Sequence, residues 1–396
     1  MTRSRILTIF SAVAIFLFSV LLPACLKAEE IKDFDFGYSL DIPEGYKIAG
    51  HTPDGMSYQF SHTILPVDLV LRLYTTDVFP DAKSALEGAL KKISASSNGT
   101  DSFLWRNAEC AIAIFDSKPI MKNGATGWAV SVNLAQKNAN LVLLCYADAA
   151  KANDCEQFIL STLNSLCTDS GSQLAPGIIT TYAFPPTEQK NVVLNIAGKT
   201  VNTSFDCDDA EANRFVIDSE YAVLSLYKNH EKWKEAWQRY YRAIFRDSYS
   251  RFSKAAFDIT SAVYPAARKK NPKNTEAEVN AILLNWVQDF EYKRGEKESA
   301  DFTSVIDAVC GKGSDCDSRC MLMCILLKQN GIKSELFVSR EYSHAVYGAD
   351  INAEGAKIEV SGTEFLLGET TAKNLRPGLI AQEQNDTEKW IPIGLE

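Results

Sequence analysis

The chain has 396 residues, of which 46% are hydrophobic and 23% are charged, and its formal net charge is −9 at pH 7. This composition is typical of a globular protein and excludes a largely disordered chain, and the length allows two or three domains that each bury a core. The acidic balance argues against nucleic acid and anionic lipid surfaces as partners, because both attract clustered Lys and Arg.

The first residues have the three parts of an export signal. Two arginines precede an uninterrupted apolar stretch, residues 6–22, and a small-residue segment ending at Cys25 follows. Residues 1–28 are therefore predicted to be a signal peptide or lipoprotein signal, outside the fold. The sequence Leu-Pro-Ala-Cys resembles a bacterial lipobox, which would make Cys25 the lipidated residue. Cleaved, lipid-anchored and uncleaved forms stay open, in decreasing order of preference. The predicted location is the periplasm or cell envelope, with any membrane tether at the N-terminus.

Ten cysteines in an exported chain point to disulfides. With Cys25 and Cys316 set aside, eight remain, an even number that permits full pairing without fixing the partners. Cys320 and Cys324 lie one helical turn apart and are predicted to be small core residues. Thiols spaced by four along one helix suit a core better than a zinc site, and the sequence has no CxxC pair and no Gly-rich phosphate loop. We therefore predict no metal and no cofactor.

Residues 33–168 are predicted to form an α+β domain of binding or scaffold type. Alternation of apolar and polar residues predicts strands at 34–42, 56–60, 69–74, 111–115, 127–134 and 141–146. Periodic apolar positions predict helices at 81–94 and 153–166. The first strand, its Pro43-Glu44-Gly45-Tyr46 ending and the strand–helix order resemble the PsbP/Mog1-like sandwich. That resemblance implies binding or scaffolding and no chemistry.

The middle of the chain contains a polar segment followed by a segment with a helical pattern. Residues 169–190 are rich in Ser, Gly, Thr and Pro and are predicted to be a linker. Residues 191–270 are predicted to be a mainly helical brace that opens with a short strand pair at 191–196 and 199–203. Aromatic residues recur there at spacings of three and four, from Trp233 to Phe245. Such a stripe favours a buried helix face over a ligand groove.

The last third of the chain places a thiol, an imidazole and a carboxylate in order: Cys316, His344 and Glu369. Breakers and cap formers precede Cys316, and an apolar-rich stretch follows it up to Asn330-Gly331. This pattern predicts a helix with Cys316 in its first turn, where the helix dipole favours the thiolate. A thiol becomes a good nucleophile when a helix N-terminus or a neighbouring imidazole helps to ionise it.

Residues 271–396 resemble the transglutaminase-like superfamily through four motifs in order. The motifs are Ser314-Asp315-Cys316-Asp317, Gly331-Ile332, His344-Ala345-Val346 and Glu369-Thr370-Thr371. Upstream, residues 277–292 are similar to the lead helix of that family, which usually ends in an aromatic residue. Two positions depart from the pattern, because Glu369 stands where Asp is commoner and Val346 where Trp is common.

The resemblance implies a papain-like catalytic domain in which Cys316 attacks an amide carbonyl, His344 acts as base and Glu369 holds the imidazole. The predicted activity is hydrolysis of a peptide or amide through a thioester, with a protein or peptide as substrate. A cross-linking transglutaminase and a catalytically silent envelope scaffold stay open as alternatives. A disulfide between Cys316 and Cys310 would favour the scaffold, and Asp350 or another group would have to replace Glu369 if that side chain pointed away.

The predicted fold class is therefore α+β, with an N-terminal α/β sandwich-like domain, a helical middle region and a C-terminal papain-like or transglutaminase-like domain. Only four histidines are present, and His344 alone lies in a matching motif. The other three, His51, His62 and His230, are predicted to be surface residues.

Overall fold

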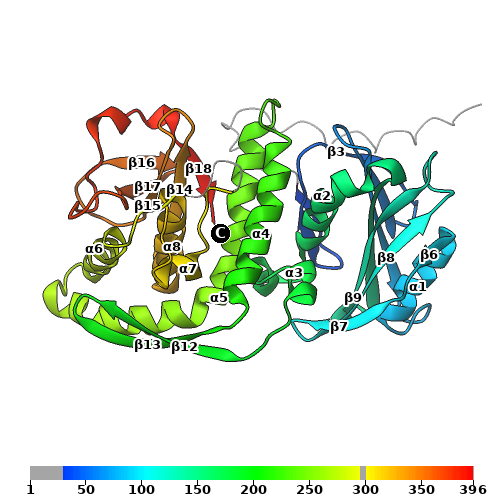
Figure 1. The fold of residues 1–396 in the computed structure, drawn as a ribbon, viewed down its shortest axis with the longest axis horizontal. Coiled ribbons are helices and arrows are strands. Elements are labelled where there is room, and N and C mark those ends of the chain that lie inside the picture. Colours follow the sequence, from blue (N-terminus) through cyan, green and yellow to red (C-terminus); the bar gives the residue numbers. More distant parts are fainter. Residues whose placement is uncertain (1–29, 295–299, 396) are drawn as a thin grey trace, which may run out of the picture.

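The computed structural model describes residues 30–294 and 300–395 and confirms the α+β class, with several sheets and a helical middle region (Figure 1). The predicted signal segment 1–28, including Cys25, lies outside the described residues. Within the described ranges, no helix has both the length and the apolar character needed to cross a membrane.

An eight-stranded antiparallel sheet forms most of the N-terminal part, in the order β3-β4-β5-β10-β9-β8-β6, with β7 also paired to β8. Its strands are β3 (Tyr46–His51), β4 (Ser57–His62), β5 (Val67–Thr75), β6 (Ala95–Ser97), β7 (Asp101–Trp105), β8 (Ala108–Ser117), β9 (Ala125–Leu134) and β10 (Ala139–Asp148). A separate three-stranded sheet contains β1 (Glu30–Asp33), β2 (Tyr38–Asp41) and β11 (Leu166–Cys167).

Helices α1 (Ala82–Lys92) and α2 (Ala152–Asn164) cover opposite faces of the large sheet. The central strand β10 explains why both faces need a cover, since successive side chains of a strand point to opposite faces. Leu141 and Leu143 share a hydrophobic core with α2, whereas Val142 and Leu144 share another with α1. The sheet is thus the middle layer of a three-layer arrangement.

The prediction that His62 lies at the surface is wrong. His62 is only 9% exposed, and its ring packs against Phe158 of α2 with the centroids 4.6 Å apart. Its Nε2 atom lies 2.9 Å from the main-chain oxygen of Glu44. The imidazole is buried by side chains from other segments, among them Tyr46, Phe158 and Tyr227, which neighbouring residues in the sequence do not reveal.

The segment 169–190 carries structure of its own. It contains a short 3-10 helix, η3 (Ser170–Leu174), and α3 (Ile178–Ala183). Ile178 and Ile179 are buried in the same core as α2. The segment therefore packs against the N-terminal part. The division of the chain into domains at these boundaries stays a prediction.

The middle region contains a hairpin of β12 (Gln189–Ile196) and β13 (Lys199–Asp206), followed by α4 (Asp209–Ser225) and the long helix α5 (Trp233–Lys270). The two helices stand between the N-terminal sheet and the C-terminal sheet (Figure 1). The prediction of a buried aromatic stripe is confirmed, because Tyr240, Tyr241 and Phe245 are each at most 5% exposed.

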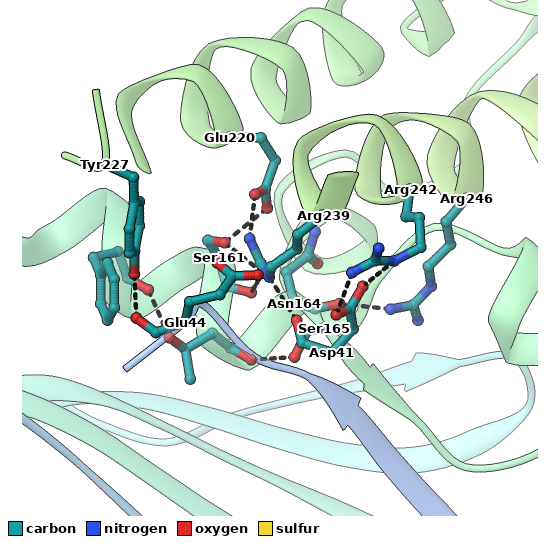
Figure 2. A network of polar contacts seen from close by, with 12 residues as sticks. Asp41, Glu44, Ser161, Asn164, Ser165, Glu220, Tyr227, Arg239, Arg242 and Arg246 are labelled. Atoms are coloured by element: carbon teal, nitrogen blue, oxygen red, sulfur yellow. Dashed lines mark hydrogen bonds and ion pairs between the residues drawn. The ribbon is translucent and has the colours of Figure 1, made fainter. Parts of the chain in front are cut away.

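Helix α5 contacts the N-terminal part through three arginines on one side (Figure 2). Arg239 is buried and donates to the Glu220 carboxylate at 2.6 Å and to Ser161 Oγ at 2.8 Å. Arg242 makes a two-pronged ion pair with Asp41 at 2.9 and 3.0 Å. Arg246 donates to main-chain carbonyl oxygens of the N-terminal part, including that of Leu166 at 2.7 Å. Buried and bidentate arginine pairs fix the relative placement of two packed parts.

Glu44 lies beside this network as a buried carboxyl group (Figure 2). The residue is 1% exposed, and neither side-chain oxygen has a hydrogen-bond partner among the described residues, whereas its main-chain oxygen accepts from Tyr227 at 2.7 Å. Burial raises the pKa of Glu44 to about 7, although the nearby Arg239 charge opposes that rise. The contact between α5 and the N-terminal part therefore contains a carboxyl group that is costly to ionise.

The C-terminal part is a five-stranded antiparallel sheet in the order β16-β17-β15-β14-β18. Its elements are α6 (Thr275–Gln288), α7 (Val305–Val309), α8 (Cys316–Gln329), β14 (Ser334–Ser339), β15 (His344–Ala349), β16 (Lys357–Val360), β17 (Thr363–Gly368) and β18 (Ile391–Gly394). Helix α8 is buried along most of its length and packs between the sheet and α5 and α6. Cys320 and Cys324 are fully buried, as predicted for core residues.

Candidate active site

Cys316 is the first residue of α8, as the cap-forming residues before it predict. The Asp315 side chain accepts from the Ser318 N–H at 2.8 Å, and Ser318 Oγ lies 3.0 Å from the Asp315 N–H, so a capping box starts the helix. Asp315 also accepts from the Thr303 N–H at 2.7 Å. These bonds satisfy helix-end donors and hold Cys316 at the N-terminal end of the dipole.

The start of β15 lies directly against this end of α8. The Ala345 N–H bonds to the Cys316 sulfur, and the Cys320 thiol lies 3.5 Å from the Ala345 main-chain oxygen. The sulfur of Cys316 is therefore next to the main chain of the residue that follows His344. Within the described residues, no hydrogen bond joins the Cys316 sulfur to the His344 imidazole itself.

His344 faces the carboxylate of Glu369, which follows β17. Nε2 of His344 lies 2.7 Å from Oε2 of Glu369, and the other oxygen accepts from Thr371 N–H and Oγ1 at 2.7 and 2.6 Å. Burial raises the pKa of Glu369, but the hydrogen bond and charge of His344 and the Thr371 bonds outweigh burial and hold that pKa below its usual value. The longer side chain of Glu thus reaches the imidazole, and an Nε2–H donated to it leaves Nδ1 as an acceptor.

Two buried side chains support this pair. Gln288, the last residue of α6, donates to the main-chain oxygen of Glu369 at 2.8 Å. Trp390, which is 5% exposed and precedes β18, packs near His344 with ring centroids 6.4 Å apart. Sequence analysis did not identify either residue. The aromatic and apolar run that begins at Trp390 was the only local signal for the second one.

Acidic groups surround the thiol. Burial, followed by the charges of Asp317 and Asp315, raises the pKa of Cys316 well above its usual value, and the Ala345 N–H and Arg294 oppose that rise. Burial and Asp315 raise the pKa of Asp317 to about 8, although the Tyr241 hydroxyl bonds to it. The predicted effect of the helix dipole is therefore outweighed here by burial and the two carboxyl groups.

The thiol is covered. Cys316 is 3% exposed, so the sulfur does not open into the cleft that a substrate requires. A cavity of about 670 Å³ beside Asp81 and Glu109 does not border Cys316.

All nine cysteines in the described residues are free thiols, so the disulfides expected of an exported chain are not formed. Cys310 and Cys316 are unpaired in particular, which removes the bridge that would have favoured a scaffold. Throughout residues 30–294 and 300–395, no group of three or more His, Cys, Asp or Glu side chains could hold a metal ion.

Comparison with known proteins gives no family. No family model and no curated protein matches the chain. Among solved structures, the Ran-binding protein Mog1p of Saccharomyces cerevisiae is similar at 11% identity and a TM-score of 0.28, over 36% of this chain and 96% of that one. PsbP of Synechocystis is similar at 12% identity and a TM-score of 0.30, over 38% of this chain and 98% of that one. A proposed protease from Parabacteroides distasonis is similar at 10% identity and a TM-score of 0.21, over 81% of this chain and 65% of that one.

Mog1p and the Synechocystis protein are similar to the N-terminal region, the part in which the sequence resembles their sandwich. At these TM-scores the similarities establish no activity. Membership of the transglutaminase-like superfamily stays a prediction.

Proposed function

We propose that the protein is a cysteine-dependent acyl-transfer enzyme of the transglutaminase-like type that hydrolyses a peptide or amide bond. One observation carries the proposal. His344 begins β15 with its imidazole 2.7 Å from the Glu369 carboxylate, and the N–H of the next residue, Ala345, bonds to the Cys316 sulfur. Cys316, His344 and Glu369 come from the start of α8, the start of β15 and the end of β17, elements that pack against one another, and this placement supports a shared site.

In the proposed reaction, the Cys316 thiol transfers its proton to Nδ1 of His344 and the sulfur attacks the amide carbonyl carbon. The carbon–nitrogen bond breaks, and the imidazolium returns the proton to the departing amine. Water then attacks the resulting thioester with His344 as base, which releases the acid and restores the thiol. Glu369 keeps Nε2–H donated and stabilises the imidazolium, and the Cys316 backbone N–H is the natural oxyanion donor.

The alternative of a catalytically silent scaffold is supported by a different observation, the burial of Cys316 with its raised pKa. A protonated, covered thiol does not attack a carbonyl. A further alternative concerns the thioester: water would hydrolyse it, whereas an amine in place of water would give cross-linking. Export to the cell envelope and a protein or peptide substrate are also proposals.

The test is to incubate the purified chain with a peptide library, with and without a primary amine, and to analyse the products by mass spectrometry. Cleaved peptides that depend on Cys316 support hydrolysis, and amine-bearing products support transfer. Cys310→Ala is the matched control, because Cys310 is an exposed free thiol near the same helix. If Cys316→Ala acts on the library as well as Cys310→Ala does, the enzymatic proposal is wrong.

A further inference from the structure

Arg294 brings a positive charge to the Cys316 thiol from a segment to which sequence analysis assigned no chemistry. Main-chain hydrogen bonds of 2.8 and 2.9 Å pair residues 291–293 with Ser314, shortly before the nucleophile. Alternate residues of an extended segment project to the same side. Tyr292 and Arg294 are accordingly neighbours, and Nε of Arg294 lies 3.2 Å from the Tyr292 hydroxyl.

The guanidinium group of Arg294 joins three parts of the candidate site. It bonds to the Cys316 sulfur, and its Nη2 donates to the Ser343 main-chain oxygen at 3.2 Å. Ser343 has a left-handed backbone conformation, with φ of 47°, and directly precedes His344. Arg294 therefore connects the thiol to the turn from which the imidazole projects. Its ion pair with Asp301 at 3.4 Å involves half-exposed side chains and is weakened by solvent.

A second arginine near the thiol is already committed to other partners. Arg319 is 1% exposed, and its donors point at Ser314 Oγ, the Thr370 oxygen and the Phe290 oxygen at 2.7 to 3.0 Å. These bonds hold loops around the start of α8. Of the two arginines, Arg294 is the one that bonds to the sulfur.

The surroundings of the sulfur show why a cation matters there. From α8, the carboxyl groups of Asp317 and Asp315 oppose a negative charge on Cys316. From α5, the Tyr241 hydroxyl is bonded to Asp317. From β15, a single N–H, that of Ala345, favours the negative charge. A guanidinium bond is the strongest available counterweight, because a hydrogen bond between charged groups is about twice as strong as a neutral one.

We propose that Arg294 is a catalytic residue that stabilises the Cys316 thiolate, and that its bond to Ser343 keeps this cation aligned with His344. The inference rests on the proposed function, in which Cys316 is the nucleophile. The proton leaves the thiol for the free imidazole nitrogen, and the guanidinium compensates the charge that remains on sulfur. Arg294 gives up no proton in this step.

The test measures thiol reactivity and needs no substrate. Iodoacetamide alkylation of Cys316 is followed by peptide mass spectrometry from about pH 6 to about pH 9.5, with the exposed free thiol of Cys207 in the same protein as reference. Replacing Arg294 by Gln is expected to slow the alkylation of Cys316 at pH 7 by about 3- to 10-fold relative to Cys207. Less of the thiol is ionised in the variant, and the higher nucleophilicity of the thiolate that does form offsets only part of this loss. The apparent pKa of the alkylation profile should rise.

Two further variants separate charge from shape. Arg294→Lys retains a cation and should recover at least part of the lost rate. Arg340→Gln is the matched control, because Arg340 is exposed in the turn before Ser343 and lies over the Trp233 ring, away from the sulfur. In this control, Cys316 should be alkylated at the wild-type rate.

Three outcomes would overturn the inference. They are an unchanged Cys316 rate in Arg294→Gln, an Arg294→Lys protein as slow as Arg294→Gln, and a wild-type Cys316 that resists alkylation at every pH while Cys207 reacts. An Arg294-dependent thiolate in a protein that cleaves no peptide would support this inference and remove the proposed function, so the two failures are distinguishable.

Discussion

Glu44 should make the protein less stable as the pH rises from 4.5 to about 7, and Glu44→Gln should abolish that loss. The carboxyl group is 1% exposed, and both of its oxygens lack a hydrogen-bond partner in the part of the chain that the structure describes. Below pH 4.5 it is neutral in both states. Between pH 4.5 and about 7 the unfolded chain releases the proton while the folded protein retains it, so stability falls. Above about 7 the full cost of burying the charge is present.

The magnitude follows from the pKa, which burial raises from 4.5 to about 7. Each pKa unit corresponds to 1.36 kcal/mol, so the loss of unfolding free energy from this group is about 3 kcal/mol. A typical protein is stable by only about 5 to 15 kcal/mol, which makes the effect measurable. Gln keeps the shape of the side chain and cannot ionise. Any constant difference in packing would be the same at every pH.

The assay is urea unfolding followed by tryptophan fluorescence at several values between about pH 4.5 and about pH 8. The stability difference between Glu44→Gln and wild type should grow by about 3 kcal/mol across that range, in favour of the variant. Glu87→Gln, on the exposed side of α1, is the control and should follow the wild-type curve. A Glu44→Gln difference that stays flat with pH would refute the reasoning, because it would mean that Glu44 ionises in the folded protein as easily as in the unfolded chain.

Three other predictions test the site and the contact between α5 and the N-terminal part. A thiol-directed electrophile should label Cys316, and His344→Ala should suppress that labelling at neutral pH; equal labelling of both proteins would count against the pair. Glu369→Gln should lower kcat on any peptide substrate by about 10²-fold or more with little change in KM, since the imidazole loses its orienting charge; stopped assays of the two proteins would measure this. Arg239→Met should destabilise the fold by about 3 to 5 kcal/mol in urea unfolding, because it leaves Glu220 buried without its cation. Restored stability in the double variant Arg239→Met/Glu220→Leu would confirm that cause, and no loss in the single variant would contradict it.

The regular elements could be predicted because their signals are local. Helix α8 begins at Cys316, where the cap formers place it, and β12 and β13 form the short strand pair that the sequence predicts there. The aromatic spacing of α5 predicted its buried face correctly. Each of these features depends on a few neighbouring residues, so no knowledge of the distant chain was needed.

The errors and omissions come from contacts between distant segments. His62 is buried by side chains from other segments, and Trp390 reaches His344 only after the last strand has joined the sheet. Arg294 carries no motif, and its position depends on the pairing of its segment with Ser314. The raised pKa of Cys316 likewise arises from burial, which the sequence alone does not give.

Helix α5 imposes a constraint on how this chain can vary. Arg239 faces Glu220 and Ser161, while Tyr241, two positions later, bonds to Asp317 beside the candidate nucleophile. Each residue of an α-helix turns the chain by about 100°, so one inserted or deleted residue between these contacts would rotate one set away from its partners. Homologous chains should therefore exchange side chains freely on the exposed side of α5 and keep the number of residues from Arg239 to Tyr241 unchanged.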